Sequence, residues 1–323
     1  MVAASGRKVA DRRVACYQPR VGRTTIVMLV LAAALVSPVG ATARADTDLP
    51  AVRSRSAVVL DAETGAEVYS KDADAVRAIA STTKIFVAMA VRAHALDLDA
   101  YTEITPTDAK SAKGGARTRL DLGQKFSNRD LLRAMLMASD NRAPTALGRG
   151  AGMTPDELIA AMNEVAKGLH LKRTKFTDAT GLRGNVSTAR EMALALHAAL
   201  QDDVLRAIMG SDYTIVESQD GYSKVHYGST NMPLRAKKWD VIGGKTGYTE
   251  AAGYCYITAA RFDSRELVMA FLGADGKQTR FADFDRVATW LDHGAPGAKI
   301  ATKRPARAKA KLDVAASGRV PKE

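Results

Sequence analysis

The sequence predicts a mixed fold of the α+β class, in which an antiparallel sheet is assembled from both ends of the body of the chain. Strand patterns occur near the two ends of that body, at 56–69 and 253–273, whereas amphipathic helix patterns fill the middle. A helical insertion at about residues 95–225 is therefore expected. A site between the sheet and the insertion is the natural place for chemistry.

The first part of the body is predicted to be a hairpin followed by a buried helix. Strands at 56–61 and 67–69 flank a turn around Gly65. Ser81 then begins an apolar helix, whose hydrophobic residues face most directions and so predict burial.

Capping patterns predict the helices of the middle. Ser127 precedes Asp130 by three residues, and Thr154 precedes Glu157 by three with a proline between them. Each pair is typical of a helix start. Another helix is predicted to begin at Ser187.

The end of the body returns to strands. Apolar runs predict strands at 253–260 and 266–273, joined by a polar turn, and a last helix is expected at about 280–291.

The net charge of +12 is confined to the two ends of the chain. Residues 1–45 contain seven Lys or Arg against one acid, and residues 294–323 contain eight against two, so the body between them is near neutral. A basic face for nucleic acid is therefore not predicted, and no nucleic-acid partner is expected.

The N-terminus predicts export. Basic residues precede an apolar run at 26–36 that is too short for a comfortable transmembrane helix, and Ala43-Arg44-Ala45 offers a cleavage site. Residues 1–45 are thus expected to be a signal peptide of a periplasmic or extracytoplasmic protein. The true start codon stays open, and Arg12-Arg13 is a poorer match to a twin-arginine signal.

The basic tail at 294–323 is predicted to be disordered, because it is rich in Lys, Arg, Ala and Pro. A solvated end is the simpler interpretation. A weak contact with an anionic membrane or wall polymer is the alternative.

Neither a disulfide nor a cofactor is predicted. Cys16 lies in the leader, which leaves Cys255 alone in the mature chain, within a segment predicted as a buried strand. The five histidines are scattered without metal-ligand spacing, so no metal is expected. The sequence contains no Gly-x-Ser-x-Gly elbow, although a Ser-His-Asp triad stays an open alternative.

Two residues at a predicted helix start indicate acyl transfer. Ser81 and Lys84, in Ser81-Thr82-Thr83-Lys84, are three residues apart, so their side chains share one face. A serine hydroxyl needs a partner that accepts its proton, and Lys84 can do so only when it is neutral. Burial and a nearby cation, for which Lys245 is the candidate, would both lower the pKa of Lys84.

Two further motifs supply binding groups. In Ser139-Asp140-Asn141, Ser139 can relay a proton and Asn141 offers a donor and an acceptor to a substrate amide. In Lys245-Thr246-Gly247, small neighbours suit a strand edge along which an extended peptide can lie, with the lysine and threonine binding a carboxylate. A phosphate-binding loop is not predicted, because Trp239 stands where that pattern needs glycine.

Over residues 53–292 the chain resembles the penicillin-recognising serine peptidases, specifically the low-molecular-mass D-alanyl-D-alanine carboxypeptidases and endopeptidases of bacterial cell-wall metabolism. Besides the three motifs, Phe176-Thr177-Asp178-Ala179-Thr180-Gly181-Leu182 and Ser187-Thr188-Ala189-Arg190-Glu191-Met192 fall in family order. The resemblance implies a five-stranded antiparallel sheet flanked by helices with an inserted helical lobe, as in β-lactamases and DD-peptidases. It implies one DD-peptidase domain at 46–293, with a sheet lobe at about 50–94 and 226–293 and a helical lobe at about 95–225.

The resemblance also implies a role for each motif residue. The catalytic residues would be Ser81 as the acylated nucleophile, Lys84 as its base, and Ser139. Substrate would be bound by Asn141, Lys245, Thr246, Gly247, Tyr248 and Arg280. The backbone N–H groups of Ser81 and Tyr248 would form an oxyanion hole, and Arg280 would help to hold a terminal carboxylate. The implied partners are peptidoglycan stem peptides ending in D-Ala-D-Ala, with β-lactams as covalent inhibitors.

Two activities stay open within the family. Carboxypeptidases remove the terminal D-alanine of pentapeptide stems, whereas endopeptidases cut the D-alanyl cross-links between stems. Asp140, Tyr248 and the absence of an extra C-terminal β-domain resemble the small endopeptidases. The carboxypeptidase is placed first because it is the commoner activity of this fold, with the endopeptidase as the alternative.

Two other classes compete. A class A β-lactamase needs a deacylating glutamate with an asparagine four positions later, and Glu157 stands in a helical pattern with the wrong spacing. A non-catalytic wall-binding protein is the second class, and the intact Ser81–Lys84 pair argues against it.

Overall fold

The structure is a computed structural model, and it describes residues 49–293 except residue 117. The predicted signal peptide at 1–45 and the predicted basic tail at 294–323 lie outside the described residues. The division into domains at 46 and 293 stays a prediction.

The strands are numbered in chain order. They are β1 (Ser56–Asp61), β2 (Glu67–Lys71), β3 (Arg77–Ala78), β4 (Tyr101–Glu103), β5 (Lys125–Ser127), β6 (Val186–Ser187), β7 (Tyr213–Glu217), β8 (Lys224–Gly228), β9 (Asp240–Thr249), β10 (Gly253–Phe262) and β11 (Arg265–Ala274).

The helices are numbered in the same way. They are the 3₁₀ turn η1 (Ala80–Thr83) and the α-helices α1 (Lys84–Ala93), α2 (Pro106–Ser111), α3 (Asn128–Ala138), α4 (Ala143–Gly150), α5 (Pro155–Gly168), α6 (Ala189–Ala199), α7 (Asp203–Met209), α8 (Met232–Ala236) and α9 (Thr279–Asp292). Across 49–293, residue 117 apart, no helix has the length and apolar character needed to cross a membrane.

Five strands form the main sheet, in the order β2-β1-β11-β10-β9. Each neighbouring pair in it is antiparallel, and β1 pairs with β11 although some 200 residues separate them in the sequence. The sheet is therefore assembled from both ends of the body, which confirms the predicted fold class. It leaves β9 as an edge strand.

The side chains of β1 alternate between two hydrophobic cores. Val58 and Leu60 belong to the larger core, which they share with the helices of the insertion. Ala57 and Val59 belong to the smaller core, which α9 covers through Phe284 and its neighbours. All six residues of β1 are buried, because both faces of this strand are covered.

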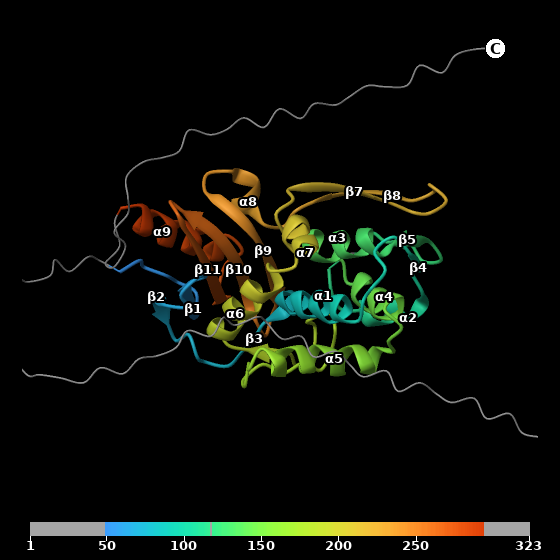
Figure 1. Ribbon diagram of the computed structural model, residues 1–323, viewed down its shortest axis with the longest axis horizontal. Helices are drawn as coiled ribbons and strands as arrows, with labels where there is room; N and C mark the ends of the chain where they lie inside the picture. The colour runs from blue at the N-terminus through green and yellow to red at the C-terminus, as the bar shows by residue number, and fades with distance from the viewer. Residues whose placement is uncertain (1–48, 117, 294–323) are drawn as a thin grey trace, which may run out of the picture.

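Helix α1 lies at the centre of the helical lobe. Figure 1 shows α3 on one side of α1 and α5 on the other, and α1 contacts α3, α4, α5 and α6. Ile85, Phe86, Val87 and Val91 are fully buried within α1. This environment confirms the prediction of a helix that is buried on most sides, and it makes the start of α1 a rigid support.

Three sequence predictions about local structure need correction. Ser81 does not begin an α-helix: it lies in the 3₁₀ turn η1, and α1 begins at Lys84. Ser187 lies in the short strand β6, and α6 begins at Ala189 with Thr188 as its cap. The insertion is not purely helical, because it contains the pairs β4–β5 and β7–β8.

The predicted helix caps are present. The Ser127 hydroxyl accepts a hydrogen bond from the Asp130 amide at 3.1 Å, and Thr154 and Glu157 form a reciprocal capping box. Each satisfies amide groups that would otherwise lack partners at a helix start.

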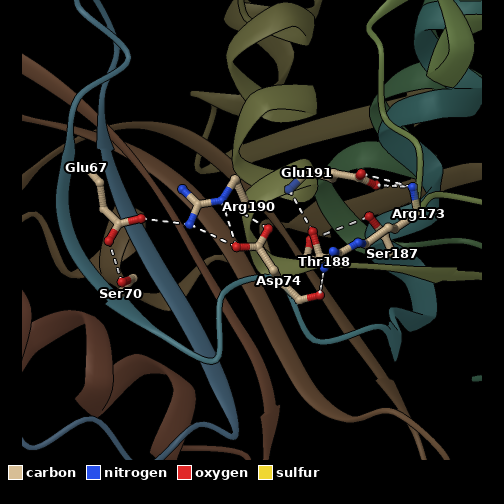
Figure 2. Close-up of polar contacts among 8 residues, drawn as sticks. All are labelled: Glu67, Ser70, Asp74, Arg173, Ser187, Thr188, Arg190 and Glu191. Atoms are coloured by element: carbon tan, nitrogen blue, oxygen red, sulfur yellow. Dashed lines mark hydrogen bonds and ion pairs between the residues drawn. The ribbon is translucent and has the colours of Figure 1, made fainter.

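A polar cluster ties α6 to the segment that leads to Ser81. Arg190, in the first turn of α6, contacts the Glu67 carboxylate at 2.7 Å and the Asp74 carboxylate at 3.1 Å (Figure 2). The Arg190 amide donates a hydrogen bond to the Ala73 carbonyl. The neighbouring Glu191 carboxylate accepts from the Arg173 amide. The connection between β2 and β3 is thereby fixed to α6.

Replacing Arg190 by alanine is expected to lower the free energy of unfolding at pH 7 by about 1 kcal/mol, the scale of a solvent-screened ion-pair network. Hydrogen bonds from Arg190 lower the pKa of Asp74, and those from Ser70 and then Arg190 lower the pKa of Glu67. Carboxylates with lowered pKa values stabilise the fold above their ordinary pKa and lose that contribution as the pH falls through the folded value. The free energies of unfolding of the wild type and Arg190→Ala, measured in urea, should therefore differ less at pH 3 than at pH 7.

The matched control is Arg129→Ala. Arg129 is also the second residue of its helix, but it contacts one carboxylate, that of Asp99, which is largely exposed. Arg129→Ala should therefore lower the free energy of unfolding clearly less than Arg190→Ala does. An Arg190→Ala protein as stable as the wild type at pH 7, or equally weakened at both pH values, would contradict the assigned role.

Candidate active site

The Lys84 amine lies at the centre of the candidate site. Its side chain is fully buried, and Nζ lies 2.8 Å from the Ser81 hydroxyl, 2.7 Å from Oδ1 of Asn141 and 2.8 Å from the Thr180 carbonyl oxygen. Ser81 is one turn away, in η1, and is partly exposed. The first two motifs are thus brought together, around a single amine.

Burial lowers the pKa of Lys84 to about 7, while the negative charges of Asp178 and Asp140 act in the opposite direction. The predicted second cause was a nearby cation. For Lys84 burial accounts for the shift, whereas the pKa of Lys245 is lowered by burial and then by the charges of Lys84 and Arg280. Near neutral pH a substantial fraction of Lys84 is therefore in the neutral form that can accept a proton.

The second motif follows the C-terminus of α3. Ser139 is the cap residue and has a left-handed backbone, with φ of 64°. Its hydroxyl makes no hydrogen bond to another described residue, so the structure does not join it to Ser81 or Lys84 in the way that it joins Asn141. This backbone is uncommon for a residue other than glycine, and such positions cluster at functional sites.

Asp140 has a fastening role that the sequence analysis did not assign. It is buried, and Oδ2 accepts hydrogen bonds from the Arg119 amide at 2.8 Å and from the Tyr227 hydroxyl at 2.9 Å. The Asp140 carboxylate therefore joins the second motif to β8 and to the loop between α2 and β5. No local pattern around Asp140 pointed to these partners, which lie far away in the sequence.

The third motif lies on the edge strand β9, as predicted. Gly247 approaches η1 so closely that a Cβ atom there would lie 2.9 Å from the Ser81 amide nitrogen. Lys245 is buried and donates to the Thr246 carbonyl at 2.8 Å, and Thr246 shares a hydrogen bond of 2.7 Å with the Thr230 hydroxyl. The third motif thus lies beside Ser81.

Thr230 is a second contact that the sequence analysis missed. It belongs to Ser229-Thr230-Asn231, a chance match to the second motif, and its amide and hydroxyl both donate to the Met137 carbonyl at the end of α3. Thr230 therefore links the third motif to the helix that precedes the second.

Tyr248 and Arg280 both lie beside the Tyr254 ring, next to the third motif. The Tyr248 ring is half exposed and stacks on the Tyr254 ring, with centroids 4.2 Å apart. Arg280 is buried, and its guanidinium donates to the carbonyls of Gly247 at 2.7 Å and Cys255 at 3.1 Å. Arg280 thus links α9 to β9 and β10; that it also holds a substrate carboxylate stays a prediction.

Cys255 is a core thiol, as its strand context indicated. It is fully buried in β10, and burial raises its pKa to about 11. A thiol with this pKa is protonated at neutral pH and is a poor nucleophile.

The comparisons with known proteins agree on one family. A family model described as D-alanyl-D-alanine carboxypeptidase matches residues 42–276. The D-alanyl-D-alanine endopeptidase of Pseudomonas aeruginosa is 32% identical to the chain, with 88% of this chain and 92% of that protein covered. The endopeptidase of Escherichia coli is 30% identical, with coverages of 88% and 94%.

A carboxypeptidase and a solved structure are also similar. The D-alanyl-D-alanine carboxypeptidase DacF of Bacillus subtilis is 28% identical, with 72% of this chain and 61% of that protein covered. The crystal structure of the Streptomyces K15 DD-transpeptidase superposes with a TM-score of 0.69 at 25% identity, and covers 75% of this chain and 97% of that one. The resemblance inferred from the motifs and the five-stranded fold are both confirmed.

Proposed function

This chain belongs to the D-alanyl-D-alanine carboxypeptidase family of serine peptidases, and on that premise we propose that it hydrolyses the bond that follows a D-alanine in peptidoglycan stem peptides, through an acyl-enzyme on Ser81. The observation that supports this most is the position of Lys84. Its buried amine, with a pKa of about 7, lies 2.8 Å from the only hydroxyl of the first motif that is partly exposed.

The first proposed step forms the ester. The Ser81 oxygen attacks the carbonyl carbon of the D-alanine while its proton passes to Lys84 Nζ. The oxyanion accepts hydrogen bonds from the amides of Ser81 and Tyr248, which the close approach of Gly247 to Ser81 favours. The C–N bond then breaks, and the amine leaves with a proton that Ser139 can relay from Lys84, since its hydroxyl is not engaged by the described residues.

The second proposed step hydrolyses the acyl-enzyme and regenerates the free enzyme. Water attacks the ester carbonyl, its proton is accepted by Lys84, and the Ser81 oxygen leaves and is reprotonated. Asn141 and the edge of β9 would align the peptide, and Lys245, Thr246 and Arg280 would attract the carboxylate beyond the bond that is cut. No metal or organic cofactor takes part in this scheme.

The family also implies β-lactams as covalent inhibitors, because they acylate the same serine. We further infer export to the periplasm or another extracytoplasmic compartment at the cell wall, where the substrate is, in agreement with the predicted signal peptide. A weak contact of the basic tail with membrane or wall polymer stays a prediction, since 294–323 lie outside the described residues.

We place carboxypeptidase action first, following the family model. Endopeptidase action on cross-links is the second candidate, and a specific finding favours it: the two endopeptidases from Pseudomonas aeruginosa and Escherichia coli align over more than nine-tenths of their length.

The test is to incubate the mature chain, residues 46–323, with pentapeptide and with cross-linked muropeptides, and to resolve the products by mass. Release of D-alanine from the pentapeptide is expected, and conversion of dimers to monomers would establish the endopeptidase instead. Ser81→Ala is the control and should abolish both. Unchanged substrates with the wild-type chain, or rapid turnover of a chromogenic cephalosporin, would overturn the proposal.

A further inference from the structure

The loop at 177–185 is organised around one carboxylate. Asp178 accepts hydrogen bonds from the amides of Thr180 at 3.1 Å, Gly181 at 3.1 Å and Leu182 at 3.3 Å, and from the Thr180 hydroxyl. These donors surround a single side chain and are consecutive in the sequence. The carboxylate therefore sets the backbone path of the loop.

Asn185 fastens the same loop to the turn that contains Ser81. Its Oδ1 accepts from the amides of Thr177 at 2.8 Å and Asp178 at 3.1 Å, and its Nδ2 donates to the Asp178 carbonyl at 2.8 Å and to the Thr83 hydroxyl at 3.1 Å. Asn185 and Thr83 are both buried. The loop and η1 are thus held as one unit.

The result of this arrangement is the position of the Thr180 carbonyl. Thr180 is buried, and its carbonyl oxygen lies 2.8 Å from Lys84 Nζ and 3.4 Å from the Ser81 hydroxyl. A neutral amine has two N–H bonds and one lone pair in tetrahedral directions. If Thr180 and Asn141 take the two N–H bonds, the remaining direction points the lone pair at the Ser81 hydroxyl.

We propose that Asp178 is a positioning residue for acylation: it holds the Thr180 carbonyl against Lys84, so that the lone pair of the amine faces Ser81. This inference rests on the proposed function of Ser81 and Lys84 and adds to it a device on a third element. Asp178 touches neither the serine nor the lysine; it acts through the backbone that it organises.

Asp178 has an electrostatic effect that a purely structural residue would lack. The charged groups around the amine are Asp178 from the loop, Asp140 from the second motif and Lys245 from β9. Both carboxylates raise the pKa of Lys84 against the effect of burial. Removing the charge of Asp178 should lower that pKa, so the rise of activity with pH, which follows deprotonation of Lys84, should move to lower pH.

The test measures the second-order rate of acylation of the full chain by a fluorescent penicillin between pH 5 and pH 9. Asp178→Asn should lower the plateau rate by about tenfold or more through misplacement of the carbonyl, and shift the acid limb to lower pH. Asp178→Glu keeps the charge but displaces it. It should therefore lower the plateau rate of acylation, while the pH at which that rate rises stays near the wild-type value. If Asp178→Asn does not fold, the plateau of Asp178→Glu still decides the positioning claim.

The matched control is Asp108→Asn. Asp108 is also a carboxylate with several donors, Arg149, Thr145 and Thr105; it is fully buried, and none of its donors lies in the candidate site. Asp108→Asn should be less stable in urea, and it should keep both the wild-type plateau rate of acylation and the wild-type pH at which that rate rises. Wild-type kinetics for folded Asp178→Asn and Asp178→Glu would overturn the inference and leave the proposed function intact, whereas no acylation of the wild type would overturn both.

Discussion

Replacing Lys84 by methionine is expected to lower the rate of acylation of Ser81 by a factor of about 10³ or more, while the protein remains folded. Methionine fills a similar volume but cannot accept a proton. Because the amine is fully buried, its removal also relieves the cost of burying a charge, which offsets the loss of its three hydrogen bonds.

The same variant should change how stability depends on pH. The folded pKa of Lys84 is about 7, below the value of about 10.4 for lysine in an unfolded chain. Between these values the unfolded chain binds more protons, so the stability of the wild type rises as the pH increases from about 7 towards 10. In Lys84→Met the free energy of unfolding should increase less over this pH range. The part of the increase that comes from Lys245, whose pKa is also lowered, should remain.

Urea unfolding at pH 7 and pH 9.5, beside penicillin acylation, measures both effects. The control is Lys167→Met, at an exposed position of α5, where the side chains of Lys167 and its ion-pair partner Glu164 are both largely exposed. It should match the wild type in rate and in pH dependence. Acylation of Lys84→Met within tenfold of the wild type would contradict its role as the base.

Replacing Gly181 by alanine is expected to damage both the fold and the site. Gly181 has a φ of +85°, and a Cβ atom there would lie 2.1 Å from the carbonyl oxygen of Ala80 and 2.9 Å from the Ser81 amide nitrogen. The added methyl group must push the turn that contains Ser81 away from the loop. A loss of acylation on the order of 10²-fold is expected, because displacements of about 1 Å have effects of that size.

Gly114→Ala separates this clash from backbone strain. Gly114 has a φ of +91°, and a Cβ atom there would have no other atom within 4 Å. Its replacement should cost only the strain of a left-handed backbone, about 1–2 kcal/mol, and should leave acylation unchanged. Urea unfolding and penicillin acylation of both variants provide the comparison. Equal effects of the two would contradict the account of loop and turn as one unit.

The parts of the fold that could be predicted are those set by local chemistry. The short apolar runs at 56–61 and 253–273 indicate buried strands, and the capping pairs at Ser127 and Thr154 indicate helix starts. The three-residue spacing of Ser81 and Lys84 fixes their relative direction, whether the turn is 3₁₀ or α-helical. Fold class and the serine–lysine pair were therefore accessible from the sequence.

The parts that could not be predicted depend on distant partners. The Thr180 carbonyl is a backbone group, and no side-chain pattern marks a carbonyl that faces an amine. In β7 the apolar residues Tyr213 and Ile215 are exposed. The sequence of β7 therefore lacks the alternation of buried apolar and exposed polar residues that predicts a strand. The helix expected at Ser187 begins later because that serine pairs with Arg77 in a short bridge of strands.

Locating the acyl group tests the central claim most directly. The chain would be incubated with benzylpenicillin and digested with trypsin, and the peptide of residues 78–84, which contains Ser81, would be fragmented by mass spectrometry. We expect the penicilloyl mass on Ser81, and no adduct in Ser81→Ala. A folded wild-type chain without an adduct, or with the adduct on another residue, would contradict the assignment of Ser81 as the nucleophile.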